Sequence, residues 1–281
     1  MMHSGSAALA QKPAPHRLLR RVASAVVPDA GKHAIDRVRE RRFLRRIGPI
    51  NDEYVRRYGL EVRGGPFAGM PYVPGQEHIS GHLIAKLVGS YERQIYPWLL
   101  DEWIAGDFEL VIDVGCAEGF YAVGLARAMP GVEVRAYDTY EPARRACAEL
   151  ARINGVRDRV IVSDLCTAST LAEVPQARVA LLSDCEGYEK FLLDPVIAPN
   201  MRAWSIIVEQ HDNVDPTISA TIERRFRDTH DIEVVESVPP DHRGVPELEW
   251  MTDEQLWLAL HERPLPMSWA LLRPRNAPAV S

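Results

Sequence analysis

The sequence predicts a doubly wound α/β fold, in which helices cover both faces of a mostly parallel sheet. After Glu109, short apolar runs alternate with segments whose apolar residues recur at helical spacing. The runs are apolar throughout, as expected for strands that are buried on both faces. A glycine-containing turn and a helical segment follow the first run at once, which is the strand–turn–helix unit of such sheets.

The strands and helices of this sheet are predicted in order along the chain. The expected strands are 110–114, 132–138, 159–164, 179–184, 204–210, 232–238 and 269–275, with the last two as a closing pair. The expected helices between them are 120–128, 142–153 and 217–227. The second helix should end at Asn154-Gly155, because this dipeptide is a C-cap signal.

Residues 1–59 are expected to form a basic helical extension. From Lys12 to Arg46 there are eleven Lys or Arg residues and three acids, and helices are predicted around 18–27 and over 33–46. One interpretation is peripheral contact with an anionic membrane or partner. The other is a helical arm that packs on the body and leaves its arginines in solvent.

Residues 60–106 are expected to lead into the core. A hairpin is predicted over 60–73, and a helix over 83–104 that is broken near Gly89 and Pro97. Residues 107–281 should form the main domain, with a lid-like insert at 239–267 that carries a helix around 254–261. His242 and Trp250 are the candidate contacts of this insert with an acceptor.

Composition narrows the class of protein. The net charge of −6 gives no strong signal for nucleic-acid binding by the whole chain. No apolar run approaches the roughly 18 residues that cross a bilayer, and no secretory signal is evident, so the expected compartment is the cytoplasm. The four cysteines form no C-x-x-C pair, which favours free thiols over a zinc site.

The strongest chemical signal is the segment Asp113-Val-Gly115-Cys116-Ala117-Glu118-Gly119, which follows the first strand and opens a helix. Such a glycine turn lets a ligand approach the backbone, and the helix N-terminus offers N–H groups. Ala117 stands where the dinucleotide motif G-x-G-x-x-G has its second glycine, which disfavours a nicotinamide dehydrogenase. The alternative is an ordinary tight connection of an α/β protein.

Two further acids end the next strands. Asp138, a little over 20 residues beyond Gly115, can accept both ribose hydroxyls of an adenosine; the alternative is an N-cap of the following helix. Asp164 can accept from the exocyclic amine of adenine while Leu165 packs against the ring; the alternative is an exposed loop acid.

Several segments resemble known methyltransferases. DVGCAEGFYAVGLA resembles motif I of the class I methyltransferases, and AYDTYEPARRACAELARINGV resembles the strand and helix that follow it. LLSDCEGYEKFLLDP and IIVEQHD resemble the later blocks of the FkbM-like family, which tend toward Asp-x-Glu-Gly and Val-Glu-x-His. GGPFAGMPYV and KLVGSYERQIYPWL resemble members from sugar and natural-product biosynthesis. The likeness covers roughly residues 60–237 and departs at Glu118, where the family often has Asn.

This resemblance implies a Rossmann-like seven-stranded sheet, S-adenosylmethionine as the cofactor, and usually O-methylation. The expected cofactor-binding residues are Asp113, Gly115, Cys116, Ala117, Glu118, Gly119, Asp138, Thr139, Asp164, Leu165 and Asp184. Tyr91 and Glu92 are expected either to fold over the methionine end of the cofactor or to lie on a helix surface.

The acceptor site is expected where the later strands end, with Asp184, Glu186, Glu209, His211 and Asp212 at one edge of the sheet. An alcohol is a poor nucleophile, so it needs a base or a metal that acidifies it. His211 is the candidate base, with Glu209 and Asp184 beside it, and the alternative is a structural histidine. Asp184, Glu209 and Asp212 are the candidate ligands of Mg²⁺.

The leading hypothesis is therefore O-methylation of a hydroxyl on a small-molecule or glycan acceptor. Two alternatives stay open. One is a methyltransferase for nitrogen or for a macromolecule, and the other is a protein that binds S-adenosylmethionine without catalysis. The oligomeric state is open as well.

Overall fold

The computed structural model describes residues 30–73, 82–175, 177–240, 242–262 and 267–275. The chain forms two compact units, Met1–Arg46 and Ile47–Ser281. The first described element is the helix α2 (Ala30–Tyr58), which is longer at both ends than the predicted helix over 33–46. Gly59 follows its last residue with a φ of +79°, as glycines after helices often do. The helix predicted around 18–27 lies outside the described residues.

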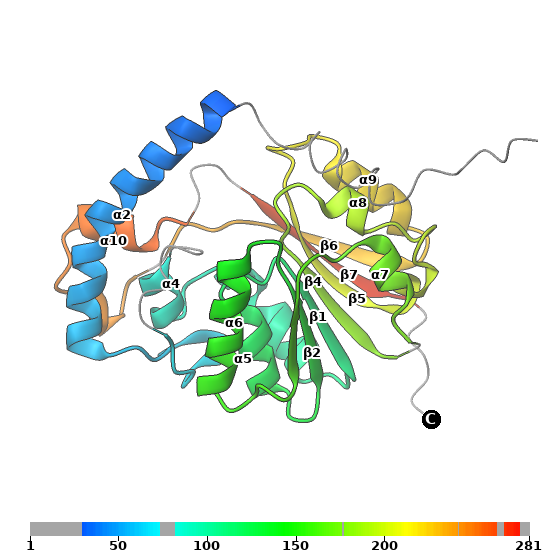
Figure 1. Ribbon diagram of the computed structural model, residues 1–281, viewed down its shortest axis with the longest axis horizontal. Coiled ribbons are helices and arrows are strands. Elements are labelled where there is room, and N and C mark those ends of the chain that lie inside the picture. The colour runs from blue at the N-terminus through cyan, green and yellow to red at the C-terminus, as the bar shows by residue number, and fades with distance from the viewer. Residues whose placement is uncertain (1–29, 74–81, 176, 241, 263–266, 276–281) are drawn as a thin grey trace, which may run out of the picture. The chain divides into compact units, whose positions relative to one another are not determined.

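A seven-stranded, mostly parallel sheet forms the centre of the second unit, which confirms the predicted fold class (Figure 1). The strand order is β3-β2-β1-β4-β5-β7-β6. The five strands β1 to β5 run parallel, and β7 runs antiparallel to both β5 and β6. The bounds are β1 Leu110–Val114, β2 Glu133–Tyr137, β3 Val160–Ser163, β4 Val179–Ser183, β5 Ser205–Gln210, β6 His230–Glu236 and β7 Ser268–Pro274.

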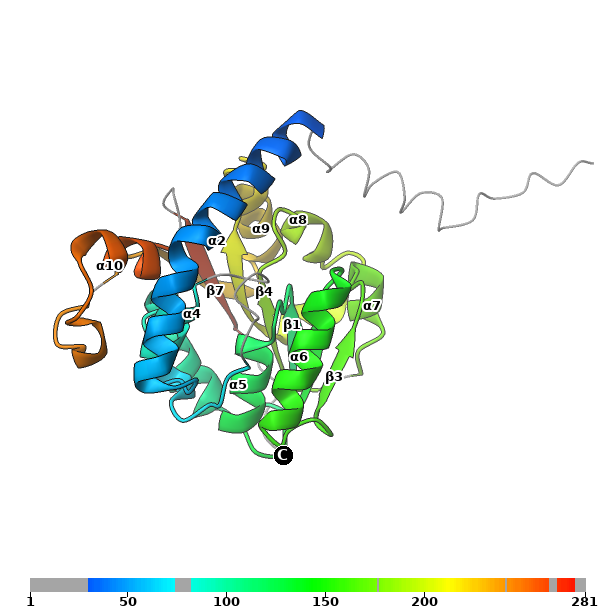
Figure 2. The ribbon, with the colours of Figure 1, turned by 60° about the vertical axis from the view of Figure 1, so that its left-hand side comes forward.

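Helical segments cover both faces of this sheet because its central strands β1, β4 and β5 are buried on both faces. On one face, Ile112, Leu181 and Val208 pack in a cluster with residues of α7 (Ala168–Ala172), α8 (Glu189–Leu192) and α9 (Ile218–Phe226). On the other face, Trp103 of the π-helical segment η3 (Trp98–Ile104) donates a hydrogen bond of 2.8 Å to Ser205 of β5. The helices α5 (Phe120–Ala128) and α6 (Glu141–Ile153) lie side by side in both ribbon views (Figures 1 and 2).

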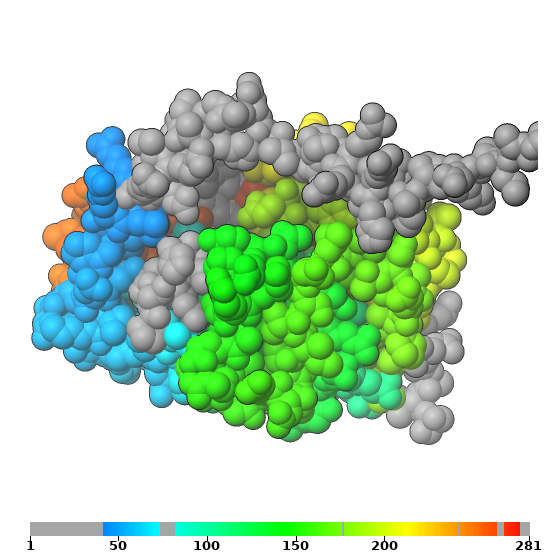
Figure 3. Space-filling model, in the orientation of Figure 1, coloured from blue at the N-terminus to red at the C-terminus, as the bar shows by residue number. Residues whose placement is uncertain are grey.

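The spacing of apolar residues in α6 determines which face of this helix is buried. Ala143, Cys147 and Leu150 recur at helical spacing and are buried against the body. The opposite face carries ion pairs three or four residues apart, such as Glu141 with Arg145. Glu141 and Arg145 are exposed, and the space-filling view shows this part of the chain, in green, at the surface (Figure 3).

The described part of residues 60–106, here called the pre-core segment, is more irregular than predicted. One antiparallel bridge, Glu61 to Pro71, joins the two runs of the predicted hairpin around the 3₁₀ turn η1 (Gly65–Phe67). The helix α4 (Leu83–Val88) ends at Gly89, as the sequence predicts. A Cβ on Gly89 would lie 2.1 Å from the carbonyl carbon of Gly64, so the two backbones touch there. The 3₁₀ turn η2 (Arg93–Ile95) precedes the predicted break at Pro97.

The insert after β6 contains the 3₁₀ turn η5 (Pro246–Leu248) and the helix α10 (Asp253–Leu260). A capping box between Thr252 and Gln255 begins α10, and this helix packs against α4. The role of the insert as a lid stays a prediction. Among the described residues, the helices are too short or too polar to span a bilayer.

Candidate active site

The glycine turn (residues 115–119) packs tightly between three strands. The backbone N–H groups of Gly115 and Cys116 donate to the carbonyl of Tyr137 at the end of β2. Gly115 has a φ of +90°, and a Cβ there would lie 1.7 Å from the carbonyl oxygen of Asp184, just after β4. Only glycine fits this position, because it tolerates both the left-handed conformation and the contact.

Asp138 holds this turn through its carboxylate. One oxygen accepts the N–H of Ala117 at 3.0 Å, and the other accepts the N–H of Tyr140 at 2.7 Å. Ala117 is held in the left-handed region, with a φ of +47°. Each carboxylate oxygen has a second lone pair, so this bonding leaves acceptor capacity for ribose hydroxyls. The neighbouring Thr139 is exposed.

Asp164 and Leu165 follow β3, and both are exposed. An exposed carboxylate and an exposed leucine at this end of the sheet suit the edge and the face of an adenine. They equally suit an ordinary loop, so their predicted role stays a prediction.

Asp113 is the buried acid at the end of β1. Burial raises the pKa of this carboxyl to about 8, and the nearby Asp184 adds to the shift. Neither of its carboxylate oxygens has a hydrogen-bond partner of ordinary geometry among the described residues, although the backbone N–H of Ala122 is near enough to lower the pKa slightly. With a pKa of about 8 this carboxyl is mostly protonated near neutral pH, and a cationic group bound beside it would favour its ionised form.

Glu118 is buried and faces the pre-core segment. Its carboxylate accepts hydrogen bonds from the ammonium of Lys86 and from the hydroxyl of Tyr72. The Lys86 ammonium also lies 4.8 Å from the ring centroid of Tyr91. The Glu118 side chain therefore ties the pre-core segment to the glycine turn, a contact that the sequence did not predict.

His211 lies just after β5 and is almost completely buried. Its Nδ1 lies 2.7 Å from a carboxylate oxygen of Glu189, at the start of α8. The same oxygen accepts the backbone N–H groups of Cys185 and Gly187. Glu189 is fully buried, so it holds the imidazole ring in one orientation.

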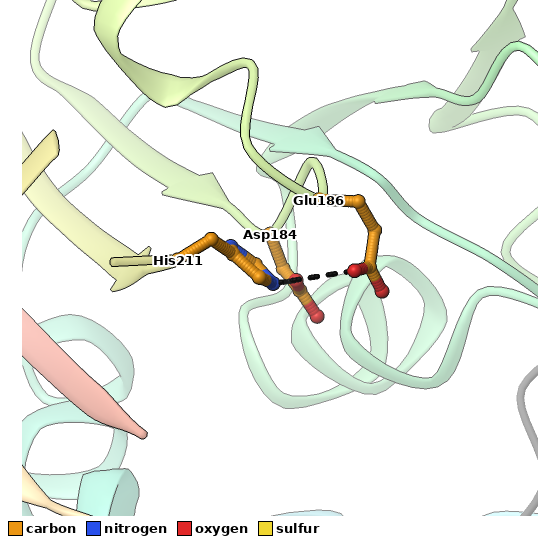
Figure 4. A group of neighbouring side chains, drawn as sticks. All are labelled: Asp184, Glu186 and His211. Carbon is orange, nitrogen blue, oxygen red and sulfur yellow. Dashed lines mark ion pairs between the residues drawn. The ribbon is translucent and has the colours of Figure 1, made fainter. Parts of the chain in front are cut away.

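The other ring nitrogen of His211 faces carboxylates. Its Nε2 lies 3.5 Å from an oxygen of Asp184, 3.5 Å from Glu186 and 3.6 Å from Glu209. Figure 4 shows the ring directed toward Asp184 and Glu186. Burial lowers the pKa of His211, but the hydrogen bond to Glu189 and the surrounding charges outweigh it, so that the net shift is upward.

A second acidic group lies beside this histidine. Three carboxylate oxygens lie within 4.8 Å of one another, one each from Glu92, Asp184 and Glu209. Glu92 is fully buried with a left-handed φ of +50°, so it is not part of a helix surface. Tyr121 donates its hydroxyl to Glu92 at 2.5 Å. We call Glu92, Asp184 and Glu209 the carboxylate triad.

Asp212 does not join either group of potential metal ligands among the described residues. Its carboxylate instead accepts the N–H of Ser219 at 2.9 Å, in the first turn of α9. The structure thus brings together Asp184 and Glu209 of the predicted metal set, but with Glu92 in place of Asp212. Sequence reasoning also missed Glu189.

The two residues of the insert that are predicted to contact an acceptor, His242 and Trp250, have different surroundings. His242 is exposed. The indole N–H of Trp250 donates to the carbonyl of Glu247, and the guanidinium of Arg57 lies 4.5 Å from a Trp250 ring centroid. Trp250 is therefore engaged with the end of α2, and an acceptor role for either residue stays a prediction.

Known proteins resemble this chain in the fold of the backbone and not in sequence. No protein-family profile matches this chain, and no curated protein matches it by sequence. A S-adenosylmethionine-dependent O-methyltransferase from Thermotoga maritima is 15% identical with a TM-score of 0.42, and the match covers 68% of each chain. A precorrin-8w decarboxylase of Methanobacterium thermoautotrophicum is 16% identical with a TM-score of 0.45, over 66% of this chain and 90% of that one.

A candidate O-methyltransferase of Klebsiella pneumoniae is 11% identical with a TM-score of 0.43, over 92% of this chain and 97% of that one. At such identities and scores the likeness concerns the fold and carries no argument about chemistry. The sheet and its helices define this chain as a Rossmann-like α/β protein. Membership of the FkbM-like family stays a prediction.

Proposed function

We propose that this protein is an S-adenosylmethionine-dependent methyltransferase that methylates a hydroxyl of a sugar, glycan or natural product. One observation carries the proposal. A buried imidazole, oriented by a buried carboxylate, lies at the same end of the sheet as the glycine turn. Asp184 links the two parts, since its carbonyl touches Gly115 and its carboxylate lies beside His211.

The residues around the glycine turn fit the cofactor. S-adenosylmethionine, when bound, supplies a methyl group that its sulfonium already activates. Asp138 has acceptor capacity for the ribose, and Asp164 with Leu165 presents an acid and an apolar surface to the adenine. In this proposal the buried Asp113 carboxyl ionises when the positively charged methionine end of the cofactor lies beside it.

His211 takes the proton of the acceptor hydroxyl in this proposal. If Nδ1 donates its proton to Glu189, the lone pair of Nε2 faces the site. The carboxylates of Glu189 and Glu186 stabilise the imidazolium that forms, so they strengthen the base. Holding the acceptor oxygen in line with the methyl group supplies the rest of the catalysis.

The test is transfer of a labelled methyl group to a panel of sugars, glycans and natural products. His211→Gln should lower the transfer rate by about 100-fold or more, because general-base catalysis is worth that much. His230→Gln is the matched control, since His230 contacts the carbonyl of Trp204 before the start of β5, away from the site, and should leave the rate near pH 7 unchanged. Transfer that survives His211→Gln would exclude the base. Transfer only to amines or RNA would favour the alternative acceptors, and binding without transfer would favour a non-catalytic protein.

Mg²⁺ is the other route to an activated hydroxyl, and we include it as an optional cofactor of the proposed enzyme. Activity that is lost with a chelator and restored by Mg²⁺ would support this part of the proposal. The cytoplasm is the proposed compartment, and the basic N-terminal extension is the proposed contact for an anionic membrane.

A further inference from the structure

The carboxylate triad concentrates negative charge where solvent screens it least. Glu92 comes from the pre-core segment, Asp184 follows β4, and Glu209 lies on β5. Glu92 and Glu209 are fully buried, and the side chain of Asp184 is 22% exposed. Three carboxylates within 4.8 Å repel one another unless a cation or protons offset their charge.

A second observation points to a ligand at the same place. Nε2 of His211 is buried and makes no hydrogen bond with the described residues. The carboxylate oxygens of Asp184, Glu186 and Glu209 surround it at 3.5 to 3.6 Å, which is longer than a hydrogen bond. Nε2 therefore keeps a capacity for one hydrogen bond that the described residues do not fill, at the edge of the carboxylate triad.

We propose that Glu92, Asp184 and Glu209 bind one divalent cation, Mg²⁺ or Mn²⁺, beside His211. Carboxylate oxygens are the ligands that these hard cations prefer. The proposed use of the ion, to lower the pKa of the acceptor hydroxyl next to the base, rests on the proposed function; its binding does not. His211 keeps its position through Glu189 and needs no direct bond to the ion.

A cation bound by Glu92 would also connect parts of the chain that are distant in sequence. Its backbone N–H donates to a carboxylate oxygen of Glu262, at the end of the described part of the insert, at 3.1 Å. The cation would therefore join the pre-core segment, and through it the insert, to the ends of β4 and β5. We expect slower backbone hydrogen exchange around Glu92 when the ion is bound.

The experiment measures Mn²⁺ binding to the full chain by the loss of the free-ion electron paramagnetic resonance signal, with Mg²⁺ as a competitor. Wild type should bind about one equivalent with a Kd below about 1 mM. Glu92→Gln and Glu209→Gln should each weaken binding by about ten-fold or more, because each removes a charged ligand. Asp212→Asn is the matched control, since it removes an acid of the predicted set that lies outside the triad, and it should change the Kd by less than about two-fold.

Two results would overturn the inference. One is no Mn²⁺ binding to wild type at about 1 mM. The other is a Kd for Mn²⁺ that Glu92→Gln leaves unchanged, while Asp212→Asn raises it as much as Glu209→Gln does. Thermal unfolding without metal shows whether each variant is folded, and Glu92→Asp, which keeps the charge, should retain more affinity than Glu92→Gln.

A parallel titration with S-adenosylmethionine in chelator separates this inference from the proposed function. Cofactor binding without Mn²⁺ binding contradicts only the metal site, and would indicate that the triad serves the cofactor's positive charge. Mn²⁺ binding that depends on Glu92, without any cofactor binding, supports the site and contradicts the proposed function.

Discussion

Gly115→Ala tests whether the glycine turn is as tightly packed against the end of β4 as the structure shows. The added Cβ would lie 1.7 Å from the carbonyl oxygen of Asp184, at a φ of +90°. Gly131 offers a matched control, because it has the same φ of +90° and no atom within 4 Å of an added Cβ. The two variants share the backbone strain and differ in the contact.

The expected loss of unfolding free energy is the sum of the backbone strain and the steric contact. An alanine in the left-handed region costs about 1–2 kcal/mol, and this is the whole expected cost of Gly131→Ala. In Gly115→Ala the backbone of Asp184 must also move, although its N–H donates to Val114 at 2.9 Å and fixes the pairing of β1 with β4. Disrupting that contact adds at least about 2 kcal/mol, so the total loss should be about 3–5 kcal/mol.

The assay is the free energy of unfolding from urea titrations, followed by tryptophan fluorescence. A folded fraction of Gly115→Ala should also show weaker S-adenosylmethionine binding, whereas Gly131→Ala should bind like wild type. Losses of stability that agree within about 0.5 kcal/mol would refute the packing argument, because the clash would then cost nothing.

Three further predictions concern buried ionisable groups. Burial lowers the pKa of His230, so the stability that its neutral form supports is present above the ordinary value of 6.5 and is lost as the pH falls below it. His230→Gln should flatten the decline of Tm between about pH 7 and 5, and an unchanged slope would contradict this. Lys86→Met should cost about 3–5 kcal/mol in urea unfolding because the buried Glu118 carboxylate loses the ammonium that it pairs with. The double variant with Glu118→Leu should regain at least half of that loss, and no recovery would argue against the pair. Glu189→Gln should lower kcat about 10- to 100-fold while S-adenosylmethionine affinity stays unchanged, since the amide oxygen can still accept from Cys185 and Gly187 but the charge that orients His211 is lost. A parallel loss of affinity would indicate a structural role instead.

The sheet could be predicted from sequence because its signals are local. Most of the strands are short apolar runs, and the observed bounds of all seven differ from the predicted ones by two residues or fewer. The shape of the predicted hairpin over 60–73 was harder to predict from sequence, because a glycine-rich turn between its two runs can adopt many conformations. The backbone contact between Gly64 and Gly89 sets its shape, and that contact joins segments distant in sequence.

The candidate site could be predicted only in part. Parallel strands deliver their ends to one edge, so the meeting of Asp184, Glu209 and His211 followed from topology. Glu92 could not be placed, because a glutamate in the left-handed conformation has no sequence signal and its burial depends on Tyr121. Asp212 is close in sequence to the site, but it bonds to α9 instead.

The most direct test of the central claim is calorimetric titration of the purified protein with S-adenosylmethionine and S-adenosylhomocysteine. Asp164→Ala is the better probe of the adenine end than Asp138→Ala, because the Asp138 carboxylate also holds the glycine turn. We predict binding of one equivalent with a micromolar Kd, weakened in Asp164→Ala with the unfolding free energy unchanged. A folded wild-type protein that binds neither compound would contradict the assignment of this site to S-adenosylmethionine.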